Sequence, residues 1–303
     1  MTSPRPAHVL CVGVAVLDNI FALERFSPEP TKNFAADFRQ TGGGPAANGA
    51  ATVARLGGAA TLWARVGDDA VGDFILRESE GIGIDVSQVR RVPGARSAVS
   101  AVAIDARGER NIYAFADPML DPSPDFLPPA PPESATLMLC DVRWPKGAAR
   151  AMAMARARGL PVVLDADLTA DDAVERLTPE ATYAIFSAPA LRRLAGPDDV
   201  EQALRRAQTR TAGVVGVTLG RDGFAWLDNG ALRRVPAFEV EVVDTLAAGD
   251  VFHGAFALGL AEGRDVEGAG RFAAAAAALK CTRWGGRYGI PTRDELDRFL
   301  AGA

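Results

Sequence analysis

The 303-residue chain has few of the residues on which metal and disulfide sites depend. It contains three cysteines, none in a CxxC pair, which argues against a disulfide framework and a cysteine-based zinc site. Its two histidines are too few for a histidine-rich metal site. No apolar run approaches the roughly 18 residues that a membrane span needs. The apolar segment 7–17 runs into Asp18 without a cleavage site, so we expect a buried strand there and a cytoplasmic protein with reduced thiols.

The chain also lacks an excess of positive charge. Its 33 lysine and arginine residues are outnumbered by 38 acidic residues, which gives no electrostatic footprint for nucleic acid or an anionic membrane. Only Lys32, Lys146 and Lys280 are lysines, and this scarcity singles them out. Hydrophobic residues make up 48% of the chain, an ordinary globular composition that excludes disorder and supports a sizeable core.

Three common nucleotide and hydrolase motifs are absent. There is no GxxxxGK[ST] sequence, which excludes a Walker-type phosphate loop. No GxGxxG follows the first apolar run, which argues against a dinucleotide site, and no GxSxG marks a nucleophile elbow.

Apolar and amphipathic segments alternate along most of the chain. We expect strands at 8–17, 60–66, 135–140, 161–166, 182–186, 213–218, 224–227 and 232–235. We expect helices at about 46–56, 71–80, 146–158, 171–177, 189–195, 198–210, 248–262, 265–280 and 292–301. This order predicts one α/β domain, 1–303, with an open, mostly parallel sheet and helices on both faces. Segments 18–41 and 97–116 interrupt the alternation and predict a small β-sheet lid over the carboxyl ends of the main strands.

The segment 243–254 holds the most informative pattern. We expect a strand to end near Asp244 and a turn of small residues to open the helix that follows. Free N–H groups at a helix N-terminus bind anions, and small residues let a phosphate approach. Asp250 then lies in the first helical turn, where it is either a helix cap or the base that takes a proton from an attacking hydroxyl. Spacing alone leaves both open.

A second glycine-rich segment, 43–48, precedes an expected helix. Glycines let the backbone approach a ligand closely, and Asn48 offers both a donor and an acceptor. A turn followed by a helix cap explains this segment equally well.

In this order and about 200 residues apart, the two segments resemble the signatures of the PfkB (ribokinase-like) carbohydrate kinases. The resemblance covers the whole chain. It implies a ribokinase-like fold and transfer of the γ-phosphoryl group of ATP to a sugar hydroxyl. It also implies a magnesium ion held mostly by phosphates and water, so we expect no metal ligands from the protein.

The resemblance further implies a role for individual residues. Asp250 is the catalytic base, and the backbone amides of Ala247, Ala248 and Gly249 form the anion hole. The sugar hydroxyls contact Asp18, Gly43, Gly44 and Asn48. The nucleotide contacts Ser187, Thr218, Gly220, Gly223, Thr245, Cys281 and Gly285.

Within the family, the segments 141–144, 163–165, 250–255 and 278–283 resemble those of sulfofructose kinases and, more distantly, of ketohexokinases. A sulfonate is a permanent anion, and Lys32 and Arg143 lie where that group places its cations. The expected substrate is therefore 6-deoxy-6-sulfofructose, phosphorylated at O1. The alternatives are another ketose, a sugar phosphate or a nucleoside. A non-catalytic sugar- or nucleotide-binding protein is the alternative from a different class.

Three positions depart from the family pattern. Leu246-Ala247 replaces the usual Thr-Gly, and alanine costs roughly 1 kcal/mol or more if that backbone has a positive φ. Segment 187–190 lacks the carboxylate that many members carry, and Ala114 replaces an asparagine of sulfofructose kinases. By analogy with relatives, we expect a homodimer that pairs through the lid.

Overall fold

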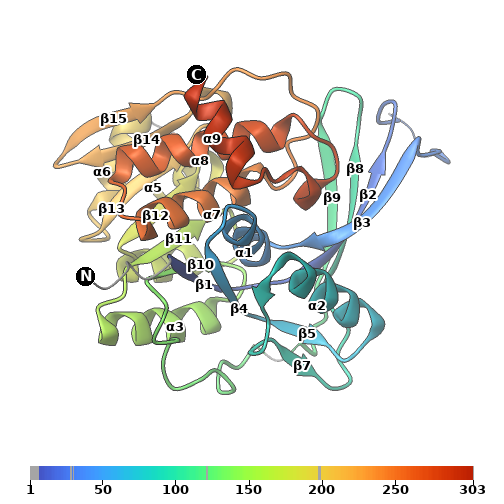
Figure 1. The fold of residues 1–303 in the computed structure, drawn as a ribbon, viewed down its shortest axis with the longest axis horizontal. Coiled ribbons are helices and arrows are strands. Elements are labelled where there is room, and N and C mark those ends of the chain that lie inside the picture. Colours follow the sequence, from blue (N-terminus) through green and yellow to red (C-terminus); the bar gives the residue numbers. More distant parts are fainter. Residues whose placement is uncertain (1–6, 28, 30, 121, 197–198, 303) are drawn as a thin grey trace.

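A nine-stranded sheet forms the centre of the fold, which a computed structural model describes for residues 7–27, 29, 31–120, 122–196 and 199–302 (Figure 1). The strand order is β15-β14-β13-β12-β11-β10-β1-β4-β6. The strands are β1 His8–Val12, β4 Ala59–Trp63, β6 Ile84–Asp85, β10 Leu137–Asp141, β11 Val162–Ala166, β12 Tyr183–Ser187, β13 Val214–Thr218, β14 Phe224–Asp228 and β15 Ala231–Val235. From β6 to β13 all neighbours are parallel, and β14 and β15 add an antiparallel edge. The predicted open, mostly parallel sheet is confirmed.

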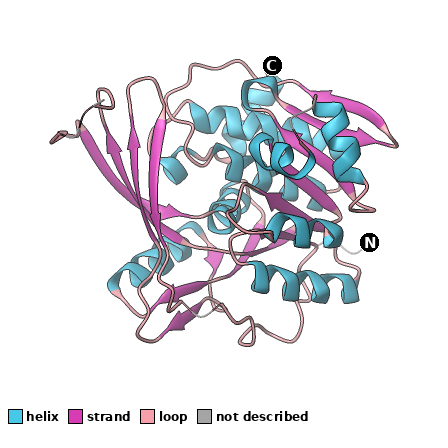
Figure 2. Cartoon of the chain, turned by 180° about the vertical axis from the view of Figure 1, so that it is seen from behind, coloured by secondary structure: helices cyan, strands magenta, loops and turns pink. Residues whose placement is uncertain are grey.

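Helices cover both faces of this sheet, which explains why its central strands are buried along their whole length and mostly apolar (Figure 2). One core packs α1 Pro45–Arg55, α2 Ala70–Ile82, α7 Ala248–Ala261, α8 Val266–Cys281 and α9 Arg293–Ala301 against the sheet. The opposite core packs α3 Pro145–Arg158, α4 Ala173–Leu177, α5 Ala188–Ala195 and α6 Val200–Gln208. All nine predicted helices are present, with ends within two residues of those expected.

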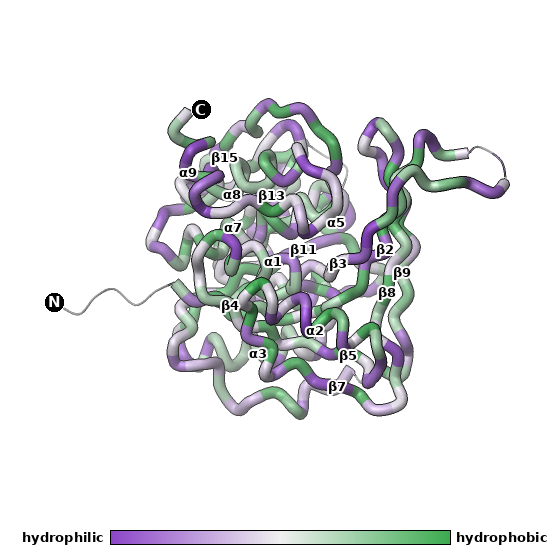
Figure 3. Tube along the Cα trace, turned by 45° about the vertical axis from the view of Figure 1, so that its right-hand side comes forward, coloured by the Kyte–Doolittle hydropathy of each residue, from purple (hydrophilic) through white to green (hydrophobic). Residues whose placement is uncertain are grey.

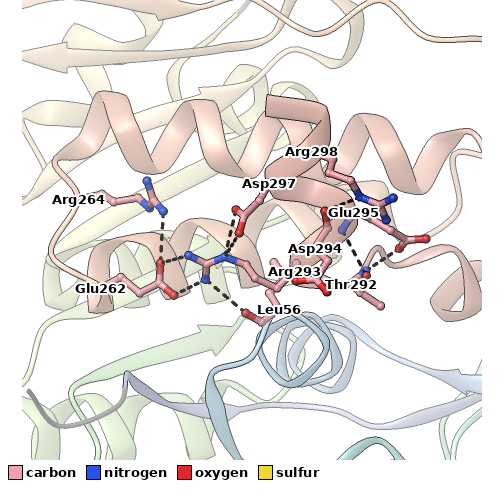
Figure 4. Close-up of polar contacts among 9 residues, drawn as sticks. All are labelled: Leu56, Glu262, Arg264, Thr292, Arg293, Asp294, Glu295, Asp297 and Arg298. Atoms are coloured by element: carbon pink, nitrogen blue, oxygen red, sulfur yellow. Dashed lines mark hydrogen bonds and ion pairs between the residues drawn. The ribbon is translucent and has the colours of Figure 1, made fainter. Parts of the chain in front are cut away.

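The C-terminal helix α9 is fastened to the core by charged groups (Figure 4). A capping box starts it, because the Thr292 side chain accepts from the Glu295 amide and Glu295 accepts from the Thr292 amide. Arg293 Nη1 lies 2.6 Å from Glu262 Oε1, just past the end of α7, and 3.4 Å from the Leu56 carbonyl oxygen. The last helix is thereby joined to the ends of α7 and α1.

A separate four-stranded sheet forms the lid, in the order β3-β2-β8-β9. Its strands are β2 Val16–Ala22, β3 Asp37–Gly43, β8 Val99–Ile104 and β9 Arg110–Phe115. The two predicted excursions meet where β2 pairs in parallel with β8. The short strands β5 Arg65–Gly67 and β7 Arg90–Val92 pair in a sheet of their own. The predicted strand 60–66 is therefore wrong, because it joins β4 and β5, which belong to different sheets, and β7 was not predicted. That residues 1–303 constitute a single domain stays a prediction.

Two further predicted strands are wrong. The apolar run 8–17 is two strands in different sheets, β1 and β2, with a break at Gly13. A side chain at Gly13 would lie 2.0 Å from a carboxylate oxygen of Asp141, so the backbone passes that carboxylate closely before it turns into the lid. Asp18 consequently lies inside the lid strand β2 and not at the end of a main strand. Residues 236–247 form no strand either, because the amides of Val243 and Asp244 donate to the Cys281 carbonyl instead of to a neighbouring strand.

A tight turn joins β14 to β15. Asn229 and Gly230 both have a positive φ there, as a type I′ hairpin requires. Among the described residues, no helix has the length and apolar character to cross a membrane.

Candidate active site

The two glycine-rich segments meet at the start of helix α7. Asp250 is half-buried in the first turn of this helix, and Asn48 lies in the first turn of α1. Asn48 Nδ2 donates to Asp250 Oδ2 over 2.6 Å, although the two residues are 202 positions apart. The amide therefore fixes one oxygen of the carboxylate and leaves the other available.

Burial raises the pKa of Asp250 to about 7. The neighbouring carboxylate of Asp165 on β11 raises it further, whereas the hydrogen bond from Asn48 and the nearby His253 lower it. Asp165 is itself buried, and its own pKa is raised well above the usual value by loss of water and by Asp167. A carboxylate with a pKa near neutrality matches what a general base needs.

His253 lies one helical turn after Asp250 and is buried. Its Nδ1 is 2.8 Å from the Gly249 carbonyl oxygen and 3.5 Å from Asp165 Oδ2, and its Nε2 is 3.3 Å from the Ile185 carbonyl oxygen. Burial lowers its pKa, so the ring is neutral at pH 7 and donates to one of these carbonyls at a time. His253 thus positions the start of α7 against β11 and β12.

The loop before α7 presents its amide groups at the helix N-terminus. Gly249 belongs to the first turn, where N–H groups have no partner within the helix. The Ala248 amide donates to the Thr245 carbonyl over 3.2 Å, which closes the turn that precedes the helix. The N-cap residue, Ala247, has a φ of 63° and a ψ of 8°.

Ala247 therefore occupies the left-handed region that glycine normally fills, at a cost of about 1 kcal/mol or more. Of the non-glycine residues that the structure describes, only Asn229 shares a positive φ. The adjacent Leu246 is buried against Ile20 and Val102 of the lid, which hold this loop in place.

Asp18, a predicted sugar contact, is buried on β2. Its Oδ1 accepts from Ser100 Oγ over 2.5 Å, and burial raises its pKa. A side chain at Gly43 would lie 2.0 Å from Asp18 Oδ2, so only glycine fits there. Gly44 is the N-cap of α1 with a φ of 92°, again a glycine conformation. The predicted sugar-binding segment therefore needs its glycines for close packing and for backbone shape.

Arg287 is a site residue that the sequence analysis did not predict. It is 2% exposed, and its Nε donates to Asn48 Oδ1 over 3.1 Å. Its Nη1 is 3.2 Å from Glu78 Oε2, and its Nη2 has no hydrogen-bond partner among the described residues. Burial lowers its pKa, opposed by the charges of Glu78, Asp18 and Asp250. Because Nε occupies the Asn48 oxygen, it fixes the amide so that the nitrogen faces Asp250.

A groove of about 1090 Å³ opens beside the start of α7. It is lined by seven of the predicted site residues: Thr218, Gly220, Gly223, Thr245, Ala248, Gly249 and Cys281. Ser187 and Gly285 are not part of this lining. Ser187 caps α5 by accepting from the Ala190 amide, and the Gly285 amide donates to Asp244 Oδ2 over 3.0 Å.

A lid residue also reaches the groove. Arg110, at the start of β9, hydrogen-bonds Thr245 Oγ1 and lines the groove beside the α7 N-terminus. The sequence placed Arg110 only within the predicted lid segment 97–116, because the approach of the lid to this loop is a tertiary contact. The contact brings a positive charge to the side of the groove where the amides of α7 begin.

The two cations predicted for a sulfonate lie in different surroundings. Arg143 follows β10, and its Nη2 is 2.8 Å from Asp167 Oδ2, in the acidic neighbourhood of Asp165. Lys32 is exposed in the connection between β2 and β3, which projects from the lid (Figure 3). The structure therefore brings Arg143 toward the site and leaves Lys32 apart from it.

The donor groups fit a magnesium ion that arrives with a nucleotide. No group of three or more His, Cys, Asp or Glu side chains in the described part of the chain is arranged to hold a metal by itself. The carboxylates of Asp165, Asp167 and Asp250 nevertheless influence one another, so a cation near them is electrostatically favoured. Phosphates and water would supply most of its ligands.

Comparison with known proteins agrees with this geometry. The model of the pfkB family carbohydrate kinases matches residues 6–293. A ribokinase of Bacillus subtilis (strain 168) is 26% identical over 297 residues, covering 97% of this chain and 99% of the relative. A fructokinase of Klebsiella pneumoniae is 31% identical over 288 residues, covering 86% and 92%.

Solved structures show the same fold. A provisionally named ribokinase from Agrobacterium tumefaciens superposes with a TM-score of 0.91 at 41% identity, covering 98% of both chains. An Arabidopsis thaliana ribokinase complexed with ribose and ATP gives a TM-score of 0.81 at 26% identity, covering 97% of this chain and 98% of its own. These matches define a ribokinase-like phosphotransferase. The chain belongs to the pfkB family of carbohydrate kinases, so it is an ATP-dependent sugar kinase.

Proposed function

We propose that this kinase phosphorylates the O1 hydroxyl of a ketohexose, with Asp250 as the base. The contact between Asn48 and Asp250 carries the proposal, because it places a carboxylate with a pKa of about 7 between the sugar segment and the anion-binding helix start. The carboxylate accepts the hydroxyl proton while the hydroxyl oxygen bonds to the γ-phosphorus and the bond to ADP breaks. Magnesium neutralises phosphate charge when bound.

The remaining residues act on position and charge. The amides of Ala247, Ala248 and Gly249 are the proposed donors to the moving phosphoryl group. Arg110 adds a positive charge from the lid, beside Thr245. Asp18, Gly43, Gly44 and Asn48 are the proposed sugar contacts, and the groove along Thr218 to Gly223 takes the nucleotide.

The proposed substrate is 6-deoxy-6-sulfofructose. Arg143 supports it, because a guanidinium 44% exposed at the carboxyl end of β10 can bind a sulfonate. An unsubstituted ketohexose such as fructose is the second candidate. Its support is the ion pair that Arg143 already makes with Asp167, together with the fructokinase relative. Lys32 would join the site only through movement of its segment or from a second copy.

The test is ADP release from Mg-ATP with sulfofructose, fructose, fructose 1-phosphate, fructose 6-phosphate, ribose and adenosine, each also run with Asp250→Asn as the blank. We expect turnover with sulfofructose to exceed that with fructose, and Arg143→Gln to raise the KM for sulfofructose alone. Turnover on fructose or ribose only would exclude the sulfosugar. Binding of ATP and sugar without turnover by the wild type would favour a non-catalytic binding protein.

We also propose a homodimer through the lid. Its exposed apolar side chains support this: Phe21, Phe38, Ile112, Tyr113 and Phe115. Light scattering of the purified protein should give twice the mass of one chain, and the Tyr113→Glu variant should have the mass of a single chain. A monomeric wild type at assay concentration would contradict the proposal.

A further inference from the structure

Of the three lysines, Lys280 alone is buried. Lys32 and Lys146 are exposed, whereas Lys280, one residue before the end of α8, is 0% exposed. An ammonium ion out of water is costly unless it is paired and hydrogen-bonded. The hydrogen-bond and ion-pair partners of the Lys280 ammonium therefore indicate its role.

Among the described residues, both polar contacts of the Lys280 ammonium are with Asp244. Its Nζ donates to the Asp244 carbonyl oxygen over 2.7 Å and lies 3.0 Å from Asp244 Oδ2. Asp244 is also 0% exposed. One of these acceptors is a carboxylate oxygen, so the two side chains form a buried ion pair; burial lowers the pKa of Lys280, and the charge of Asp244 and the hydrogen bond to it oppose that shift.

The Asp244 carboxylate connects two segments of the active site. Its Oδ1 accepts from the Leu246 amide over 2.7 Å, within the loop that leads to the α7 N-terminus. Its Oδ2 accepts from the amides of Gly285 and Gly286, each over 3.0 Å. The first segment supplies the proposed anion hole, and the second carries Arg287, which orients Asn48.

Without the ammonium ion, Asp244 would be an unpaired buried anion six residues before Asp250. It would repel phosphate charge at the loop, and it would find a lower energy by moving toward water. The repulsion weakens phosphate binding, and the movement of Asp244 displaces the amides of Leu246, Gly285 and Gly286 that it now holds. An ion pair that served folding alone would not need its other hydrogen bonds to end on these two segments.

We propose that Lys280 is a positioning residue for phosphoryl transfer. Its ammonium ion neutralises Asp244 and so fixes the loop 245–249 and the turn 285–287 in their active arrangement. The inference rests on the proposed role of that loop in phosphate binding.

Removal of the side chain tests this directly. Lys280→Ala leaves a space beside an anion, and we expect kcat to fall about 100-fold with little change in the KM for sugar. Ammonium or methylammonium chloride should restore at least a tenth of the lost activity, since a small cation fits the space. Tetramethylammonium chloride, at equal ionic strength, should not. Lys146→Ala, on the exposed side of α3, should keep wild-type activity and ignore all three salts.

A second readout does not depend on turnover. In the free protein, hydrogen exchange of the amides in 245–249 and 285–287 should speed up in Lys280→Ala and slow again with methylammonium. Should that variant not fold, Asp244→Asn combined with Lys280→Met removes both charges; we expect it to fold, with low kcat and no response to cations.

Wild-type kcat in either variant, or a lowered Tm with normal kcat and unchanged exchange in both segments, would overturn the proposal. A wild type that turns over no sugar contradicts the proposed function instead, and the exchange measurement still decides the role of Lys280.

Discussion

Arg287 and Arg293 both bind carboxylates near the C-terminus, but their surroundings differ. Arg293 is one-third exposed, and its hydrogen bonds to Glu262 raise its pKa. Arg287 is buried, its pKa is lowered more by burial than neighbouring charges raise it, and its Nη2 has no hydrogen-bond partner in the described part of the chain. The surroundings of Arg293 stabilise its charged form, whereas those of Arg287 destabilise its charged form. We infer from this comparison that the buried charge of Arg287 is kept for the active site. The partly exposed ion pair of Arg293 on α9 stabilises the fold.

The largest expected effect comes from Arg287→Met. Without Nε, the Asn48 oxygen loses its donor and the amide no longer fixes Asp250, so kcat should fall about 100-fold. Steady-state kinetics at saturating ATP would measure it, and calorimetry would confirm folding. The matched control is Arg293→Met, the same change outside the site. Equal kcat in the two variants would break the comparison.

The pH profile is the next largest effect. The base must be deprotonated, so kcat/KM should rise about tenfold per pH unit below an apparent pKa of about 7 and level off above it. That value belongs to the coupled Asp250 and Asp165 carboxylates together. Initial rates from pH 5 to 9 would show it, and a profile that is flat down to pH 5 would argue against Asp250 as the base.

The folding stability that depends on Asp250 should fall as pH rises, whereas kcat/KM rises with pH. Because the folded-state pKa of Asp250 is raised, ionisation between about pH 4 and 7 weakens the fold as pH rises. In the scaffold, Arg283 lowers the pKa of Glu295 to about 2, so its contribution is present at neutral pH and is lost as pH falls from about 4.5 toward 2. Asp250→Asn should therefore raise Tm at pH 8 and change it little at pH 4. A lower Tm at pH 8 would contradict this.

Arg293→Met should cost stability and spare activity. The variant loses hydrogen bonds to Glu262 and to the Leu56 carbonyl, and partial exposure limits the expected loss to about 1–2 kcal/mol. Urea unfolding would measure the change, with kcat remaining within about twofold of wild type because the hydrogen-bond partners of Arg293, which are Glu262, Asp297 and Leu56, are not proposed site residues. A large fall in kcat would contradict this prediction and show that α9 influences the active site.

The smallest expected effect is a gain. Ala247→Gly relieves the positive φ, which should stabilise the fold by up to about 1 kcal/mol after the greater freedom of glycine in the unfolded chain is counted. Asn229→Gly is the matched control at the other positive φ, where asparagine is already tolerated and little change is expected. Equal effects in urea unfolding would mean that no strain is stored at Ala247.

Much of this molecule could be predicted from local patterns. Hydrophobic periodicity located the helices and the main strands, and the two glycine-rich segments identified Asn48 and Asp250, which lie in contact. The failures have tertiary causes. Gly13 interrupts an unbroken apolar run because the chain must pass Asp141 there, and Arg110 and Arg287 reach the site only through the packing of the lid and of the last turn. The φ of Ala247 could not be predicted, because alanine gives no signal for it.

One lid strand has two duties. On β2, Asp18 is a proposed sugar contact, and Ile20, two positions further along on the same face, packs against Leu246 beside the proposed anion hole. A movement of β2 that uncovers the sugar site therefore also withdraws the apolar support of the anion hole. The enzyme would then be poorly shaped for attack by water in the absence of sugar, and ATP would be spared from futile hydrolysis.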